Sequence, residues 1–151
     1  MRSIGLLVIL VAACGAKEEA EAYKAKSQAA EAKIYLHRLS NNLKSSFNQN
    51  SAFPVGKVGP SPAQPCCKNA GGTCAVSADW GKDPVWVSVD FDPFDPHRFQ
   101  YTYQSDGKTV VATAIGDLDC DGTTITYKLE MGVGNAGEPT AVFTDAKVSD
   151  D

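Results

Sequence analysis

Three aspartates alternate along one short segment, which reads Asp117-Leu118-Asp119-Cys120-Asp121-Gly122. Carboxylates spaced in this way can converge on a hard cation such as Ca²⁺, because the glycine permits the sharp turn that convergence needs. The second half of a calcium loop is not present, since Lys128 stands at the twelfth position, where a bidentate glutamate is required. Glu130 lies nearby, but on an alternating strand it shares its face with Lys128. The three aspartates therefore predict either a Ca²⁺ site or an acidic β-turn that binds no metal.

Cysteine is the second residue type that could do chemistry. The chain has five cysteines: Cys14, Cys66, Cys67, Cys74 and Cys120. An odd number is unusual in a secreted protein, and setting Cys14 apart leaves an even set of four. Those four have neither the spacing of a zinc site nor a Cys-x-x-Cys pair, so two structural disulfides are predicted. Adjacent Cys66 and Cys67 would be strained if joined, which favours one of them pairing with Cys74 and the other with Cys120.

The surroundings of Cys14 resemble those of a bacterial lipoprotein. Met1 and Arg2 precede about ten apolar residues, a run that suits a secretory signal and is too short to span a membrane. The run ends in Val11-Ala12-Ala13-Cys14, which resembles a lipobox. The resemblance implies that residues 1–13 are a cleaved signal peptide and that Cys14 carries a lipid that anchors the chain to a membrane. Gly15 follows in place of an aspartate, which favours the outer membrane. The alternative is an ordinary signal peptide with a chance cysteine.

Charge and the remaining polar and aromatic residues narrow the function classes. After removal of residues 1–13, 13 basic and 18 acidic residues leave a net charge of −5, which disfavours nucleic acid and anionic lipid as partners. His37 and His97 are not accompanied by a Gly-x-Ser-x-Gly elbow or any other nucleophile motif, so no catalytic residue is predicted. Trp80 and Trp86 predict core packing or a cover for a sheet edge rather than a platform for a sugar.

The elements that must position these residues follow from hydrophobic periodicity. Residues 16–48 are predicted to be helical, with one apolar stripe at steps of three and four: Ala25, Ala29, Ala32, Leu36, Leu39, Leu43 and Phe47. The stripe is only alanine at first, so residues 14–33 are expected to be a solvated tether that follows the lipid anchor. From residue 34 onward the helix is expected to pack on a sheet.

The rest of the chain is predicted to form a loop followed by an antiparallel sheet. Residues 49–84 are rich in glycine and proline and predict a long irregular loop that the disulfides hold in place. Alternating patterns predict about four strands, at residues 85–91, 99–104, 109–115 and 123–131. Asp106-Gly107 predicts a type I′ hairpin turn. The domain is therefore of the α+β class, with a head over residues 34–131 and a loosely ordered tail, 132–151, that has at most a short strand at 141–143.

This order of elements resembles that of type IV pilins and pseudopilins. Residues 25–33 are similar to the Lys-Ser…Glu-Ala segment of pilin helices, and residues 112–122 are similar to the Ala-x-Gly-Asp-Leu-Asp-Gly-Asp-Gly stretch of many pilin-like proteins. Residues 99–103 also fit the second strand of that family, so that the resemblance covers residues 23 to about 131. It implies a pilin-like head and partners in a pilus or secretion assembly. It also adds weight to Ca²⁺, because some pseudopilins bind that ion in a loop of the head.

The chain departs from the family at its amino terminus. It has no prepilin leader and no run of some twenty apolar residues after one, so it is not expected to enter a filament by the core packing of pilins. The function expected from the sequence is that of a lipid-anchored, non-enzymatic envelope protein with a pilin-like head that binds another protein or assists a type IV pilus or secretion assembly. Two alternatives remain open: an independent surface module that binds calcium or a glycan, and an unrecognised hydrolase.

Overall fold

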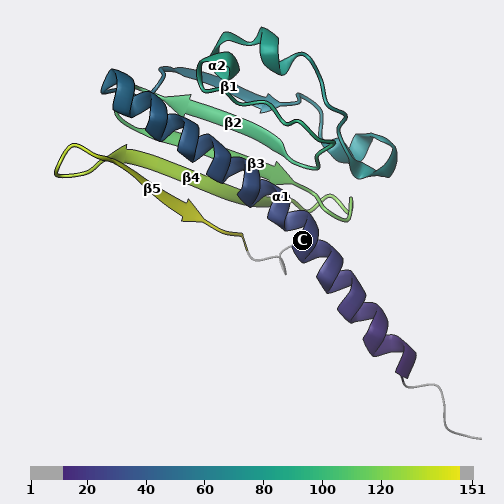
Figure 1. The fold of residues 1–151 in the computed structure, drawn as a ribbon. Helices are drawn as coiled ribbons and strands as arrows, with labels where there is room; N and C mark the ends of the chain where they lie inside the picture. The colour runs from purple at the N-terminus through teal and green to yellow at the C-terminus, as the bar shows by residue number, and fades with distance from the viewer. Residues whose placement is uncertain (1–11, 147–151) are drawn as a thin grey trace, which may run out of the picture.

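In the computed structural model, which describes residues 12–146, the chain begins with one long helix, α1 (Ala12–Asn50). The predicted helix is confirmed and extends slightly beyond both predicted ends. Alanine, leucine, lysine and glutamate, which favour helices, make up much of its length. The helix ends at Asn50, and the next residue, Ser51, adopts a φ of 56° and donates its backbone N–H to the Phe47 carbonyl at 2.7 Å. Figure 1 shows that the second half of α1 crosses the sheet, whereas the first half extends beyond it.

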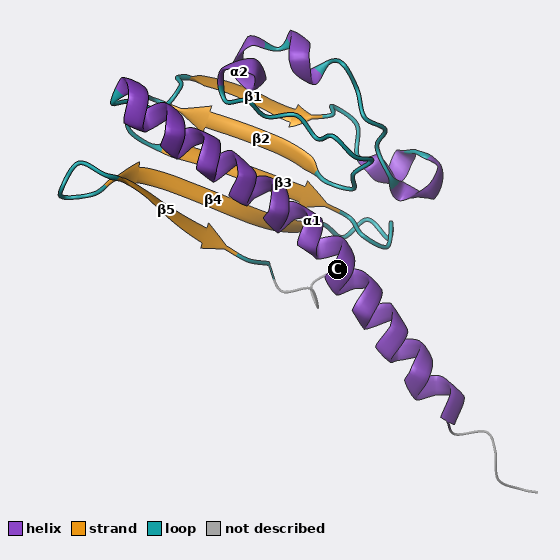
Figure 2. Ribbon diagram, viewed as in Figure 1, coloured by secondary structure: helices purple, strands orange, loops and turns teal. Residues whose placement is uncertain are grey.

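A five-stranded antiparallel sheet follows the helix (Figure 2). The fold is therefore α+β, with five strands where four were predicted. The strands are β1 (Gly56–Ser61), β2 (Gln100–Ser105), β3 (Val110–Gly116), β4 (Ile125–Val133) and β5 (Pro139–Thr144). Between β1 and β2 lie the short helix α2 (Pro84–Ser88) and three single 3-10 turns, η1 (Cys66–Lys68), η2 (Ala70–Gly72) and η3 (Trp80–Lys82).

The strands are ordered along the sheet as they are along the chain, so that each pairs with the next. Tyr101 of β2 lies opposite Ala114 of β3, which lies opposite Tyr127 of β4. All three side chains point to the face that α1 covers, where each is at most 1 % exposed. Their neighbours along the strands point to the opposite face, because side chains alternate along a strand.

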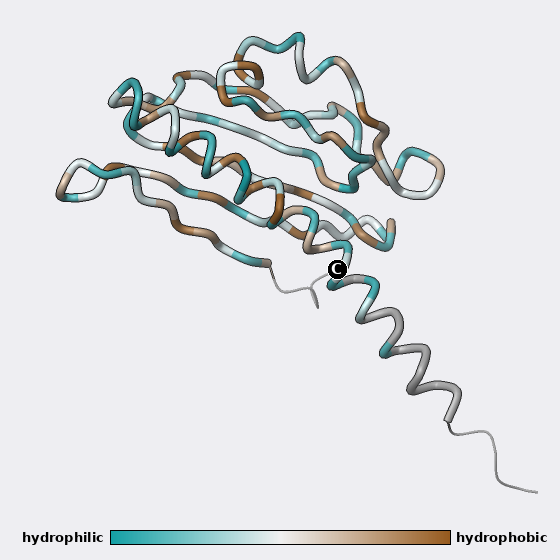
Figure 3. The backbone as a smooth tube through the Cα atoms, in the orientation of Figure 1, coloured by the Kyte–Doolittle hydropathy of each residue, from teal (hydrophilic) through white to brown (hydrophobic). Residues whose placement is uncertain are grey.

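The core lies between α1 and this covered face. The predicted apolar stripe of the helix is buried from Ala29 to Phe47, and Figure 3 shows hydrophobic residues of α1 where the helix crosses the sheet. Burial therefore begins within the segment expected to be the tether. Tyr35 packs edge-on against Tyr101 and Phe91, with ring centroids 5.7 and 6.1 Å away. Burying one such large apolar side chain contributes about 1.5–3 kcal/mol, so the helix is held mainly by its second half.

The predicted strand at residues 85–91 is wrong, because its first half forms the helix α2. Asp83 caps that helix, and its carboxylate accepts hydrogen bonds from the backbone N–H groups of Val85 and Trp86. Pro84 occupies the first helical position, where its fixed φ and missing N–H are tolerated. These local preferences override the alternation of valines, which is too short a pattern to specify a strand by itself.

Two further strands lie where little order was expected. β1 falls within the predicted irregular loop and pairs with β2 at one edge of the sheet, with a register shift between Val58 and Ser61. Strand β5 falls within the predicted loose tail and pairs with β4 along its whole length. The turn after β2 contains Gly107 at a φ of 93°, but Asp106 is not among the positive-φ residues, so the predicted type I′ geometry is wrong. The Asp106 carboxylate instead accepts hydrogen bonds from the N–H groups of Lys108 and Thr109.

Within residues 12–146, no helix combines the length and the apolar character that crossing a membrane requires.

Candidate functional site

Two disulfides organise the end of the sheet from which α1 emerges (Figure 1). Cys66 is bonded to Cys74, and Cys67 is bonded to Cys120 at the loop between β3 and β4. The predicted pattern, in which the adjacent cysteines take Cys74 and Cys120 as separate partners, is confirmed. Cys66 and Cys67 share the 3-10 turn η1, and successive residues of such a turn point about a third of a turn apart. One sulfur therefore faces the interior while the other faces the acidic loop.

The three predicted calcium ligands come together in that loop. One carboxylate oxygen each from Asp117, Asp119 and Asp121 lies within 4.8 Å of the others. Several of their oxygens accept backbone hydrogen bonds within the loop. Asp117 Oδ2 accepts from Gly122 N–H at 3.0 Å, and Asp119 Oδ1 accepts from Asp121 N–H at 3.0 Å. The hydrogen bond from Thr123 N–H, at 2.6 Å, lowers the pKa of Asp121, so this carboxyl is ionised well below neutral pH.

The carboxylates fit a hard cation in part. Asp117 Oδ1 is buried and has no hydrogen-bond partner among the described residues, so it is a ligand atom without an assigned role. Glu130, however, forms an ion pair with Lys128 at 2.7 Å on the strand that follows. The cluster holds three carboxylates, so any further ligands would have to be backbone carbonyls or water. The structure of the loop thus agrees with its sequence: the three carboxylates of the first half of a calcium loop are in place, and the glutamate of the second half is not.

A hollow of about 370 Å³ separates the acidic loop from the turn η1. Asp117 and Asp121 lie on one side of it, and the basic residues Lys68 and Arg98 also line it. The Cys67 sulfur contacts the Asp117 carbonyl oxygen at 2.9 Å, and both residues line the hollow. A ligand with both negative and positive groups would find complementary charge here.

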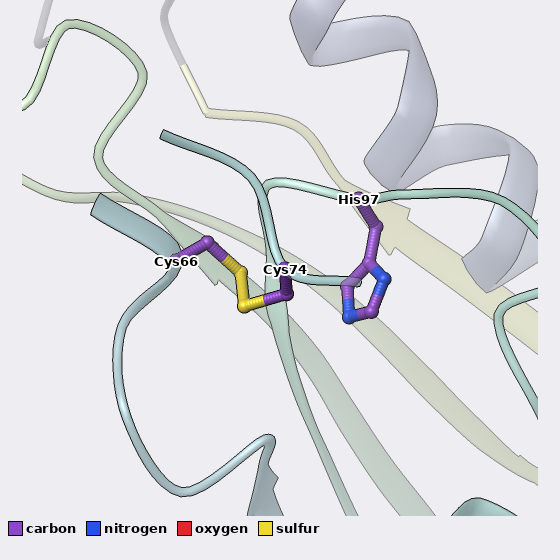
Figure 4. Close-up of side chains that lie close together, drawn as sticks. All are labelled: Cys66, Cys74 and His97. Atoms are coloured by element: carbon purple, nitrogen blue, oxygen red, sulfur yellow. A yellow bond between two sulfur atoms is a disulfide. The ribbon is translucent and has the colours of Figure 1, made fainter. Parts of the chain in front are cut away.

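His97 is buried beside the Cys66–Cys74 disulfide (Figure 4). Its backbone pairs with that of Cys74 in both directions, through N–H···O bonds of 2.7 and 3.0 Å. The ring lies against Trp80 and Tyr101, with centroids about 6 Å away. Burial lowers the pKa of His97, and the hydrogen bond from Nδ1 to the Asp95 carbonyl, at 3.3 Å, opposes this only in part. The sequence contains no sign of this juxtaposition, since His97 is far from both cysteines along the chain.

Other candidate residues have structural roles. Trp80 and Trp86 are 5 % and 1 % exposed, and they pack on each other with centroids 5.2 Å apart. The preference for core packing is confirmed, and neither ring can act as a sugar platform. His37 stacks on Phe143 of β5 at 3.9 Å. The structure therefore brings the three aspartates together and places His97 beside the Cys66–Cys74 disulfide, whereas His37 stacks on a residue of β5.

Glu31 is a polar residue that sequence reasoning treated only as part of a helical motif. Its carboxylate accepts a hydrogen bond from the backbone N–H of Arg98 at 2.8 Å, and the Arg98 guanidinium lies 3.8 Å away. Burial raises the pKa of Glu31 because it penalises the charged form more than these two contacts favour it. The contact ties α1 to the segment just before β2, at the point where the helix leaves the sheet.

The proposed lipidation site lies near the start of α1. Cys14 belongs to the helical backbone, but its side chain is not among those described, and residues 1–11 of the predicted signal peptide lie outside the described part. Comparison with known proteins gives no family model, no curated protein and no solved structure that matches the chain.

Proposed function

We propose that this protein is a lipid-anchored, non-enzymatic component of the bacterial cell envelope, in which a pilin-like head binds a protein of a type IV pilus or secretion assembly. The observation that carries the proposal is the division of α1 into two halves. The second half is packed on the sheet, whereas the first half projects from the head and contains Cys14 close to its start. An arm of this kind would hold a head at a distance from a membrane.

The length of the arm follows from helix geometry. Cys14 and Ala29, where burial begins, are separated by 15 residues, which is about 22 Å of helix at 1.5 Å per residue. Tyr23 in this arm is 77 % exposed. An arm of this length can act as a spacer between a lipid surface and the head.

The surface most distant from Cys14 is the natural place for a partner. There the end of α1 meets the β2–β3 and β4–β5 hairpins around a hollow of about 570 Å³, lined in part by Phe47, Lys108 and Val133. Val133 is 46 % exposed, so apolar surface is available beside a positive charge. This combination suits a protein partner better than a small polar substrate.

A non-enzymatic role is supported by the histidines. Among the described residues, neither His97 nor His37 forms a hydrogen bond to a serine or threonine hydroxyl, and the two sulfur atoms beside His97 are joined in a disulfide, so the pairing of histidine and nucleophile that a hydrolase requires is not formed there.

The anchor is tested by intact mass and membrane fractionation of the protein from its own host. We expect a chain that begins at Cys14, carries a diacylglyceryl group and sediments with the outer membrane, and we expect Cys14→Ser to abolish both properties. An unmodified chain, or one found in sheared filaments, would refute the anchor.

The partner is tested by site-specific photo-crosslinking in the same host. A crosslinker at exposed Asn135, in the β4–β5 hairpin, should yield an adduct with a pilus or secretion protein, whereas one at exposed Glu19, in the arm, should not. The same adduct from both positions, or an adduct with no assembly component, would contradict the proposed presenting surface.

The buried and unpaired Asp117 Oδ1 favours a second candidate function, the binding of Ca²⁺ by the acidic loop. In about 5 mM CaCl₂ the free energy of unfolding should rise by about 1–2 kcal/mol, if the affinity is that of extracellular calcium modules. Asp117→Asn should remove this gain and Asp79→Asn, at an exposed position elsewhere, should keep it. Equal stability with CaCl₂ and with MgCl₂ would rule out a calcium-specific role.

A further inference from the structure

Three metal-ligating side chains from separate segments meet in the interior. The sulfur atoms of Cys66 and Cys74 and a ring nitrogen of His97 all lie within 4.8 Å of one another. The three residues are 2 %, 5 % and 1 % exposed. In Figure 4 the imidazole ring turns one nitrogen toward the disulfide and the other away from it.

The two ring nitrogens have different surroundings. Nδ1 is within hydrogen-bond distance of the Asp95 carbonyl, which can only accept, so Nδ1 carries the proton. Nε2 then presents a lone pair, and it has no hydrogen-bond partner in the described part of the chain. A histidine that donates one N–H to a backbone carbonyl and offers its other nitrogen is in the state that binds a metal. The His97 ring is therefore neutral and oriented as a ligand, and Nε2 has no hydrogen-bond partner among the described residues.

We propose that, before Cys66 and Cys74 are oxidised, these two cysteines and His97 form a buried site for a thiophilic metal ion. Two thiolates and one imidazole are the donor set that Zn²⁺ and Cu⁺ prefer. Two thiolates balance the charge of Zn²⁺, whereas Cu⁺ is satisfied by three ligands. Binding releases one proton from each thiol, and the metal keeps its oxidation state.

Metal binding and disulfide formation are alternative fates of the same two sulfurs. Oxidation removes two electrons and two protons from the thiols and transfers them to an oxidised disulfide such as glutathione disulfide, which is reduced to two thiols. Since the site is buried, the ion enters while the reduced chain folds. A bound ion would then protect Cys66 and Cys74 from oxidation and from pairing with Cys67.

A second cluster in the same chain supplies the comparison. Cys67, Cys120 and Asp117 also bring three possible ligand atoms within 4.8 Å, but they are half-buried or exposed and include a hard carboxylate in place of imidazole. Thiophilic ions should prefer the buried set, because a carboxylate suits harder cations. The two clusters can be separated by mutation, since each has its own pair of cysteines.

The experiment uses the full chain with Cys67→Ser and Cys120→Ser, reduced with a phosphine, unfolded, and refolded without oxygen in one equivalent of Zn²⁺ or of Cu⁺. After removal of unbound metal, we expect one ion per chain for at least one of the two metals. We also expect oxidised glutathione to form the Cys66–Cys74 bond at least tenfold more slowly than in the metal-free chain. The variant with Cys66→Ser and Cys74→Ser, which keeps Cys67 and Cys120, is treated in the same way. It should retain less than a tenth of an equivalent of either metal after unbound metal is removed.

The role of the imidazole is tested separately with His97→Phe, which keeps an aromatic ring but removes both nitrogens, in the same Cys67→Ser, Cys120→Ser background. It should bind the ion at least tenfold more weakly, while His37→Phe binds like its parent. Recovery of the helical circular-dichroism signal and of the Cys66–Cys74 bond on oxidation shows that the His97→Phe variant has folded. If this variant does not fold, His97→Gln is used in its place. Less than a tenth of an equivalent of either metal in the parent, or equal retention after loss of His97, would overturn the proposal.

Discussion

The bridge between Cys67 and Cys120 closes a loop of 53 residues, the longer of the two loops closed by disulfides in the described structure. Chain-entropy arguments assign such a bridge about 4 kcal/mol at 25 °C, because it restricts the unfolded chain. Cys120 is exposed and Cys67 is only half-buried, so replacing them by alanine removes little packing. Loss of the bridge should therefore cost about 4 kcal/mol, a large part of the 5–15 kcal/mol that keeps a domain folded.

The assay is urea unfolding of the oxidised protein, compared with Cys67→Ala, Cys120→Ala and the double variant. Each single change already breaks the bridge, so all three variants should lose about 4 kcal/mol, and the double variant should lose no more than either single one. The m-value should rise in all three, because the unfolded chain expands when the loop is opened. Any thiol left free is alkylated before unfolding, so that it cannot exchange with Cys66 or Cys74.

Two results would refute the reasoning. Additive losses from Cys67→Ala and Cys120→Ala would mean that each side chain contributes through its own contacts and not through the bridge. A loss below about 1 kcal/mol in the double variant, with an unchanged m-value, would mean that the sheet and η1 hold this end in place without the bridge.

Three further predictions address the core, the buried imidazole and the edge strand. Leu43→Ala should lower the free energy of unfolding by about 2–5 kcal/mol, because the side chain is fully buried. Ile34→Ala, at 60 % exposure, should change it by less than about 0.5 kcal/mol. Similar losses of stability for the two variants in urea unfolding would contradict the packing of α1. Burial lowers the pKa of His97, so below pH 6.5 the unfolded chain takes up a proton that the folded chain does not. The free energy of unfolding therefore falls as the pH falls from 6.5 toward the folded-state pKa. In urea titrations His97→Phe should weaken this acid dependence, and an unchanged dependence would contradict the prediction. Gly59→Ala should destabilise the fold by at least about 1 kcal/mol, because its φ is 97° and a Cβ would overlap the carbonyl oxygen of Tyr101 in β2. Gly81→Ala, with open space around it, should be neutral in thermal unfolding.

The long helix and the three central strands could be predicted because each has a pattern that matches one face of the core. The stripe that ends in Leu39, Leu43 and Phe47 has the helical period, and Tyr101 and Tyr103 alternate as strand residues do. In these segments the buried face and the local backbone preference agree, so tertiary packing has nothing to override.

The errors fall where those two signals disagree. Strand β1 contains Gly56, Gly59 and Pro60, which indicate a turn, and proline is tolerated there because β1 lies at the edge of the sheet and need not donate every backbone N–H. Asp83 and Pro84 carried a helix signal that outweighed the alternation after them.

The candidate site could be predicted in its parts but not in its assembly. The alternation of Asp117, Asp119 and Asp121 predicted their convergence, because the residues are close in sequence. The meeting of His97 with Cys74 depends on a backbone pairing between two irregular segments, and no local pattern encodes such a pairing.

The position of two adjacent cysteines on one turn raises a question of timing. A chain that is delivered from its amino terminus onward presents Cys66, Cys67 and Cys74 well before Cys120, which lies in the loop after β3. During that interval Cys74 can form a disulfide with either of two adjacent cysteines. Only the bond with Cys66 leaves Cys67 free to pair with Cys120. A premature Cys67–Cys74 bond would have to be undone by exchange, in which Cys66 attacks it and liberates Cys67. Correct maturation of this protein should therefore depend on a thiol–disulfide isomerase more strongly than the two bridges of the described residues would suggest.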